Sequence, residues 1–151
     1  ESVAGKSAEL HELRGRIARA KGKLAEAAQE YAEAVRLKPH NVDFRMELSS
    51  LLRDTGRKAD ALRVLEDGRP LGGEVDGRYM HVLGLALLEA GRAQEAVEAL
   101  ETAATLEMHS ADIYFALARA HHKIGNLARS DRALQRAYTL KPELRKKAFE
   151  P

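Results

Sequence analysis

The sequence contains no cysteine and no tryptophan, and only 5% of its residues are aromatic. Without cysteine, the chain cannot form a disulfide framework, a thiolate metal site or a cysteine nucleophile. Its charge is also nearly balanced, with 25 basic and 23 acidic residues. The composition therefore does not predict a nucleic-acid partner.

Long apolar runs are absent as well. No stretch of about 18 apolar residues exists, so the sequence predicts no transmembrane segment. The N-terminus lacks the basic and then apolar pattern of a signal peptide. Because the chain begins at Glu1 rather than at methionine, we expect it to be processed or cut from a longer protein. We expect a soluble protein whose location is unknown, with the cytoplasm and the periplasm both open.

Helix-forming residues dominate what is present. Alanine, leucine, glutamate and arginine are abundant, and 44% of the 151 residues are hydrophobic. This composition is typical of a helical protein, and the length is that of one domain with its own core.

An internal repeat runs along the whole chain. Four glycines are separated by 34, 35 and 34 residues, namely Gly22, Gly56, Gly91 and Gly125. Each glycine is preceded by one small residue and followed by another, and then by a large residue one helical turn further on. These three columns are Gly15, Ser49, Gly84 and Ala118; Ala27, Ala61, Ala96 and Ser130; and Tyr31, Leu65, Leu100 and Leu134. A period of this length predicts stacked supersecondary units.

Apolar residues recur at helical spacing between the glycines, as Leu83, Leu87 and Leu88 do. Each unit is therefore expected to be a pair of helices, with its glycine in the left-handed conformation between them. The expected first helices are about 9–21, 43–55, 78–90 and 111–124. The expected second helices are about 24–37, 58–67, 92–105 and 127–140.

The repeated residues resemble the tetratricopeptide repeat (TPR), whose pattern runs W-x2-L-G-x2-Y, then A-x3-F, then P. The residues that carry the resemblance are Leu83-Gly84, Gly15, Ala27-x3-Tyr31, Pro39, Leu117-Ala118 and Pro142. The third unit departs from the pattern, with Met80 in place of tryptophan and Leu87 in place of tyrosine. The resemblance covers about residues 8–144. It implies an all-α fold, a right-handed superhelical solenoid of four helix-turn-helix units.

The expected domain organisation follows the repeat. A TPR domain at 8–144 has units at about 8–41, 42–76, 77–110 and 111–144, after an N-terminal extension at 1–7. Residues 145–151 are interpreted as a partial capping helix or the start of a further repeat. The second unit breaks the pattern, because Pro70 and the following glycines end its second helix near Asp67. This break is interpreted as a tolerated loop, with a hinge as the alternative.

Motifs of catalysis and cofactor binding are missing. The pair Gly72-Gly73 lacks the lysine of a phosphate-binding loop, and no Gly-x-Ser-x-Gly elbow occurs. His81 and His122 lie on neighbouring expected first helices, but they lack a third metal ligand. His121 is interpreted as a packed core residue. We therefore expect no enzyme, no cofactor and no metal site.

The TPR resemblance implies that a partner lies along a concave face formed by the first helices. Carried over by position, the residues that we expect in this groove are Arg16, Arg19, Met46, Arg53, Arg78, His81, Val82, Leu85, Leu88, Phe115, Arg119 and His122. Their apolar and arginine side chains suit a peptide or amphipathic helix of another protein, apolar with acidic flanks. The predicted function is a non-catalytic protein-interaction module or scaffold.

Two alternatives remain open. Residues 74–117 carry a net charge of −6 and residues 118–151 a net charge of +6. This asymmetry favours self-association, in which a structural protein polymerises through its charged ends. The other alternative is that the segment positions the partner of a larger enzyme or of a secretion or assembly complex. Nucleic acid is not expected, because few aromatic residues accompany the basic C-terminal part.

Overall fold

The computed structural model describes residues 3–146 and 149, and these residues form only helices and connecting turns. The α-helices are α1 (Val3–Ala20), α2 (Leu24–Leu37), α3 (Val42–Asp54), α4 (Lys58–Gly68), α5 (Gly77–Glu89), α6 (Ala93–Leu106), α7 (Ala111–Lys123) and α8 (Leu127–Leu140). Short 3₁₀ helices are η1 (Arg69–Leu71), η2 (Gly73–Val75) and η3 (Pro142–Lys146). The predicted all-α class is confirmed.

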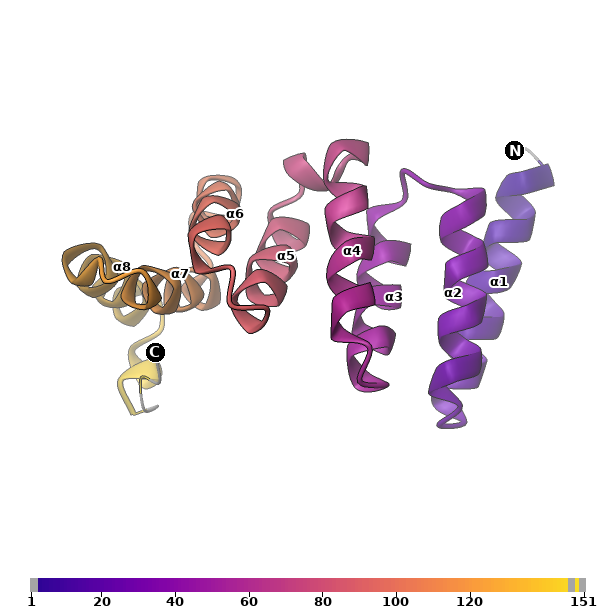
Figure 1. The fold of residues 1–151 in the computed structure, drawn as a ribbon, viewed down its shortest axis with the longest axis horizontal. Coiled ribbons are helices and arrows are strands. Elements are labelled where there is room, and N and C mark those ends of the chain that lie inside the picture. The colour runs from indigo at the N-terminus through magenta and orange to yellow at the C-terminus, as the bar shows by residue number, and fades with distance from the viewer. Residues whose placement is uncertain (1–2, 147–148, 150–151) are drawn as a thin grey trace. The chain divides into compact units, whose positions relative to one another are not determined.

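The helices belong to two compact units. Unit 1 is Glu1–Gly73 and unit 2 is Glu74–Pro151. Within unit 1, α1 packs with α2 and α3 with α4; within unit 2, α5 packs with α6 and α7 with α8 (Figure 1). The chain therefore contains the four predicted helix pairs, two in each unit.

Glycines end the first helix of each pair, as the repeat predicts. Gly22, Gly56, Gly91 and Gly125 have φ angles of 73°, 79°, 76° and 77°. This left-handed conformation carries little steric cost only for glycine. It also lets the next residue bond back to the helix, as the N–H of Lys23 does to the carbonyl oxygen of Ala18 at 2.9 Å.

The small residues of the repeat sit where the two helices of a pair come close. A Cβ atom on Gly84 would lie 2.5 Å from Cγ of Leu100, and one on Gly15 would lie 2.8 Å from the Tyr31 ring. In the fourth pair, the Ser130 hydroxyl donates a hydrogen bond to the carbonyl oxygen of Ala118 at 2.8 Å. In these three pairs, close packing of the two helices explains the small residues of the repeat.

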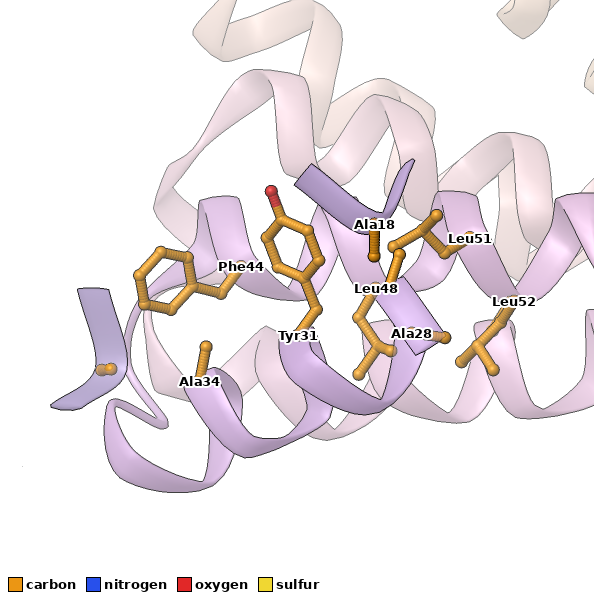
Figure 2. Packing of buried hydrophobic residues seen from close by; sticks show 11 residues of the cluster. Ala18, Ala28, Tyr31, Ala34, Phe44, Leu48, Leu51 and Leu52 are labelled. Atoms are coloured by element: carbon orange, nitrogen blue, oxygen red, sulfur yellow. The ribbon is translucent and has the colours of Figure 1, made fainter. Parts of the chain in front are cut away.

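The core of unit 1 brings together buried residues of α1, α2, α3 and α4, with Tyr31 among them. The Tyr31 ring meets Phe44 edge-on, with centroids 6.4 Å apart, and its hydroxyl oxygen lies at the end away from the α2 backbone (Figure 2). Leu51 and Ala27 are fully buried in the same cluster. This core fixes α1 and α3, and with them the side chains between these helices.

The core of unit 2 contains the largest fully buried side chains of α5 and α6, among them Tyr79, Met80 and Leu100. Met80 is 0% exposed, so the residue that replaces the family's tryptophan is a core residue. At the start of α5, the Asp76 carboxylate accepts a hydrogen bond from the N–H of Tyr79 at 3.1 Å. Beyond α8, Leu144 is buried with Ala111 and Ala137.

Some helix boundaries differ from the prediction. Helix α1 begins at Val3 rather than at about residue 9, because no proline interrupts the backbone between Val3 and the first core residue, Ala8. Residues 142–146 form a 3₁₀ helix, which starts earlier than the expected capping helix at 145–151. Residues 147–148 and 150–151 of that expected helix lie outside the described residues. The units at 8–41, 42–76, 77–110 and 111–144 stay predictions.

The break in the second repeat lies where the sequence predicts it. Helix α4 ends at Gly68, one residue beyond the expected Asp67, and η1 contains Pro70. The boundary between the two compact units follows shortly after, at Gly73. Among the residues that the structure describes, no helix is long and apolar enough to cross a lipid bilayer.

Candidate functional site

The first helices of unit 1, α1 and α3, border a hollow of about 760 Å³. We call this surface the α1/α3 face. Its lining includes Arg16 and Arg19, which the repeat register places in the groove, and also Tyr31 and Lys38 from α2 and its C-terminal end. The hollow is strongly charged, because Glu9, Glu12, Asp43 and Glu47 line it as well.

Ion pairs connect the elements around this hollow. Arg19 of α1 pairs with Glu47 of α3, and Lys38 pairs with Glu9 at 3.1 Å. Among the described residues, Arg16 forms no ion pair with a carboxylate, so its exposed guanidinium is available to a ligand. Glu12, which also lines the hollow, forms no ion pair among the described residues either, so the hollow offers both a cation and a carboxylate to a ligand.

The Tyr31 hydroxyl lies beside this charge cluster. Burial raises the pKa of Tyr31, and the nearby carboxylates of Glu47 and Glu12 raise it further, although Arg16 and Arg19 oppose them. The phenol is therefore neutral at physiological pH and can donate or accept a hydrogen bond. Tyr31 was predicted only as a packing residue, because it belongs to an apolar repeat column.

The other two expected groove residues of unit 1 do not line the hollow. Met46 and Arg53 are half-buried on α3 and are not among its lining residues. Conversely, Lys38 and Asn41 line it, although both follow the second helix of their repeat. Family positions taken only from first helices cannot identify residues from the connections.

The corresponding surface of unit 2 is formed by α5 and α7, and we call it the α5/α7 face. Its expected apolar residues, Val82, Leu85, Leu88 and Phe115, are all half-buried. None of them belongs to the fully buried core. They therefore retain apolar surface that a ligand can cover.

Phe149 already covers part of this face. Its ring meets the ring of Phe115 edge-on, with centroids 5.6 Å apart, and also approaches the exposed ring of His122 at 5.9 Å. Phe115 and His122 are both expected groove residues, and they are brought together here. The sequence marked the segment around Phe149 as a partial helix but carried no signal for this contact.

Two polar residues of the α5/α7 face, His81 and Arg78, interact with nearby carboxylates. Burial lowers the pKa of His81, while the neighbouring Asp112 carboxylate opposes this effect. A neutral imidazole is therefore expected at pH 7. Arg78 pairs with Asp76 at 2.9 Å, beside the start of its own helix, and Arg119 is half-buried on α7.

Metal ligands do not gather in the described part of the chain. Residues 3–146 and 149 contain no group of three or more histidine, aspartate or glutamate side chains arranged to hold an ion. His121 is 3% exposed, which agrees with its interpretation as a packed residue.

Together, the α1/α3 and α5/α7 faces offer apolar contact, hydrogen bonds and charge, the interactions with which proteins bind peptides.

These helix pairs correspond to a known family. A family model described as Tetratricopeptide repeat matches residues 18–79 and 87–140, which is more than half of the chain. The chain belongs to the tetratricopeptide repeat family. Human tetratricopeptide repeat protein 7A is 33% identical over 105 residues, 70% of this chain but 12% of that protein. The chain thus spans about an eighth of this curated relative.

Solved structures show the same TPR fold. A crystal structure of MamA has a TM-score of 0.86 and 24% identity, covering 94% of this chain and 77% of that one. A MamA structure from Desulfovibrio magneticus RS-1 has a TM-score of 0.83 and 21% identity, covering 93% and 79%. YrrB, described as a TPR protein with an unusual peptide-binding site, has a TM-score of 0.78 and 20% identity, covering 91% and 70%.

The family membership supports a protein-interaction scaffold. TPR proteins bind other proteins or peptides and are generally non-catalytic. The predicted TPR resemblance and the all-α helix-turn-helix fold are confirmed. The groove residues stay predictions.

Proposed function

We propose that this chain is a non-catalytic module that binds a peptide or helix of another protein, and that the α5/α7 face of unit 2 receives an aromatic or large apolar side chain of that partner. The observation that carries the proposal is the contact of Phe149 with Phe115 and His122. A surface that accommodates one aromatic ring from an intrachain segment has the shape and polarity for an aromatic ring of another chain.

The neighbouring side chains extend this apolar contact. Val82, Leu85 and Leu88 are half-buried, so a ligand along α5 would remove their remaining apolar surface from water. Apolar burial contributes about 25 cal/mol per Å², and a few anchor residues usually supply most of the binding free energy. Phe115 is the anchor contact expected to matter most.

The α1/α3 face supports an interaction with a polar segment. Its hollow of about 760 Å³ has room for several side chains, and Arg16 has no ion-pair partner among the described residues. A guanidinium binds a carboxylate through two parallel hydrogen bonds. An acidic residue of a ligand is therefore expected at Arg16. The peptide-binding site named for YrrB, which shares the fold, agrees with peptide binding by this chain.

The test uses peptides selected on the wild-type chain from a random peptide library. Binding is then measured by fluorescence anisotropy for Phe115→Glu and for the control Leu127→Glu, which changes an apolar residue on α8 that is 56% exposed. We expect Phe115→Glu to weaken binding by about tenfold or more, and Leu127→Glu to change it by less than about twofold.

Far-UV circular dichroism checks the helicity of both variants. If Phe115→Glu loses helicity, Leu85→Glu takes its place, since Leu85 lies on the same face and is half-buried. Equal losses in the α5/α7 variant and in Leu127→Glu would contradict the proposal, and so would binding that neither α5/α7 variant weakens.

A second candidate function is self-assembly, favoured by the charge difference between residues 74–117 and 118–151. It predicts a molar mass that rises with protein concentration and falls with added salt, because salt screens exposed charges. Sedimentation equilibrium measures both dependences. A constant monomer mass would exclude this candidate.

A further inference from the structure

A hollow in unit 2 lies between the second helices α6 and α8, and its lining includes none of the expected groove residues. Its volume is about 430 Å³, and α7 forms its floor with Tyr114, Leu117 and His121. Arg129, Arg132 and Arg136 of α8 line it, together with one carboxylate, Glu101 of α6. We call it the basic hollow.

Glu101 compensates only one side of the basic hollow. Its Oε1 atom lies 3.5 Å from Nη1 of Arg129 and 3.6 Å from Nε2 of His121. Arg132 donates from Nε to the carbonyl oxygen of Ala128 at 3.3 Å, but it pairs with no carboxylate among the described residues. The positive charge of Arg132 is therefore not balanced by a carboxylate of the basic hollow.

Arg136 also lacks a carboxylate partner among the described residues, and the ring of Tyr114 holds its guanidinium in position. Its guanidinium carbon lies 5.8 Å from the centroid of the Tyr114 ring, within the range of a cation–π contact. In the described part of the chain, it has no carboxylate partner either. The aromatic ring orients the guanidinium without neutralising it, so Arg136 remains able to bind an anion.

Unit 1 provides an internal comparison. The equivalent hollow there, between α2 and α4 over α3, has nearly the same volume, about 410 Å³. By the repeat register, Asp60 stands at the position of Arg129, and Asp67 at that of Arg136. Asp60 accepts from Arg57 at 2.8 Å and lies 3.9 Å from Arg63.

The two hollows thus have the same construction but a different charge. Acidic and basic side chains are present in equal numbers around the hollow of unit 1, whereas arginine outnumbers glutamate three to one in the basic hollow. Packing of the repeats does not require this excess, because unit 1 packs without it. The excess therefore points to a ligand of opposite charge.

We propose that the basic hollow binds an acidic segment of a partner protein, with its carboxylates on Arg132 and Arg136 and an apolar side chain over Leu117. Charge complementarity selects the carboxylates, because arginine guanidinium and carboxylate match in a two-bond geometry. The apolar floor favours a peptide over a nucleic acid, since Arg136 already covers a face of Tyr114, the aromatic ring of the hollow on which a base would stack.

The test uses a fluorescein-labelled peptide of glutamates around a central leucine, and the same peptide with glutamine in place of glutamate. The key variant is Arg132→Gln/Arg136→Gln in the full chain. The matched control is Arg57→Gln/Arg63→Gln, which changes two arginines of the equivalent hollow in unit 1. All four substituted residues are exposed, so both variants are expected to fold.

We expect the wild type to bind the glutamate peptide about tenfold more tightly than the glutamine peptide. Arg132→Gln/Arg136→Gln should remove this preference, and the control should keep it. Amide chemical shifts that change on binding should lie on α7 and α8 around the basic hollow. Phe115→Glu should leave this binding unchanged, which separates the inference from the proposed function.

Three results would overturn the inference. The first is an equal loss of binding in the control variant, and the second is equal affinity for the two peptides. The third is a higher affinity of the basic hollow for a single-stranded oligonucleotide of the same charge than for the glutamate peptide. Arg132→Lys/Arg136→Lys keeps the charge but not the two-bond geometry, so binding at an intermediate affinity would support the guanidinium–carboxylate contact.

Discussion

The ring of Phe149 stands at 84° to the ring of Phe115, with 5.6 Å between their centroids. Such edge-to-face pairs contribute about 0.5–1.5 kcal/mol beyond the area that they bury. Because Phe115 lies on the α5/α7 face, an intrachain residue occupies the position that we assign to a partner side chain. Ligand binding and the Phe149 contact should therefore compete.

The variant Phe149→Ala tests this competition. We expect it to bind the selected peptides about two- to tenfold more tightly than the wild type, since no intrachain ring must be displaced. In the free protein, the ring protons of His122 should shift in NMR spectra, because the Phe149 ring lies 5.9 Å from that imidazole. Lys146→Ala, at an exposed position of η3, is the control. Unchanged His122 resonances together with weaker peptide binding would contradict the prediction.

The close approach of Gly84 and Leu100 carries a prediction about stability. Alanine has a helix propensity about 1 kcal/mol better than glycine, so Gly84→Ala would stabilise an exposed helix. Here its Cβ would lie 2.5 Å from Cγ and 2.7 Å from Cδ2 of Leu100, which is far too close. We expect a net loss of about 1–3 kcal/mol in the free energy of unfolding, measured by urea denaturation.

A double-mutant cycle identifies the cause of that loss. In the background of Leu100→Ala, the substitution Gly84→Ala should cost at least about 0.5 kcal/mol less, because the Leu100 side chain is gone. Equal costs in the two backgrounds would mean that something other than Leu100 opposes the new methyl group.

The repeat columns explain why so much of the fold was predictable. A glycine with a positive φ angle, such as Gly125, recurs in every unit. A small residue beneath a large side chain recurs at Gly15 under Tyr31 and at Gly84 under Leu100. Each recurrence is an independent observation of the same geometry. The contacts of Phe149 and Lys38 occur once, so no periodic signal reveals them.

The basic hollow was only partly predictable for a related reason. Its arginines were recognised in the sequence as a basic region, but the pairing of Glu101 with Arg129 and the contact of Arg136 with Tyr114 join different helices. Side-chain geometry, which the sequence does not specify, decides which charges are compensated.

We expect the free energy of unfolding to depend on pH because of the buried His121. Burial lowers the pKa of its imidazole, and Arg129 and Arg132 of α8 lower it further, while Glu101 of α6 opposes them. Below pH 6.5 the unfolded state therefore binds a proton that the folded state does not take up until its lower pKa is reached. The stability should fall as the pH drops through this window.

The variant His121→Leu removes this dependence, since leucine is the residue at the equivalent position, Leu52, in unit 1. Between pH 7 and pH 5, wild type should lose more unfolding free energy than His121→Leu, as measured by urea denaturation. His109→Leu, at an exposed position between α6 and α7, should behave as wild type does. Parallel curves for wild type and His121→Leu would contradict a buried neutral imidazole.

The last prediction concerns the start of α5. Burial of Asp76 disfavours its charge, but hydrogen bonds from the Arg78 side chain and from the N–H of Tyr79 outweigh this effect and lower its pKa. The charged cap therefore stabilises the fold above the unfolded-state pKa, and this contribution is lost as the pH falls through the lower folded-state pKa. Asp76→Ala should cost about 0.5–2 kcal/mol of unfolding free energy at pH 7.

Asp76→Asn separates the cap from its charge. Asparagine keeps an acceptor for the N–H of Tyr79, as Asn41 does at the start of α3, but it loses the ion pair with Arg78. Wild type should therefore be more stable than Asp76→Asn at pH 7, and the difference should shrink as the pH falls below about 4, where the unfolded carboxyl is protonated. Thermal unfolding followed at both pH values measures this change. A difference that grows on acidification would show that the carboxylate destabilises the folded state.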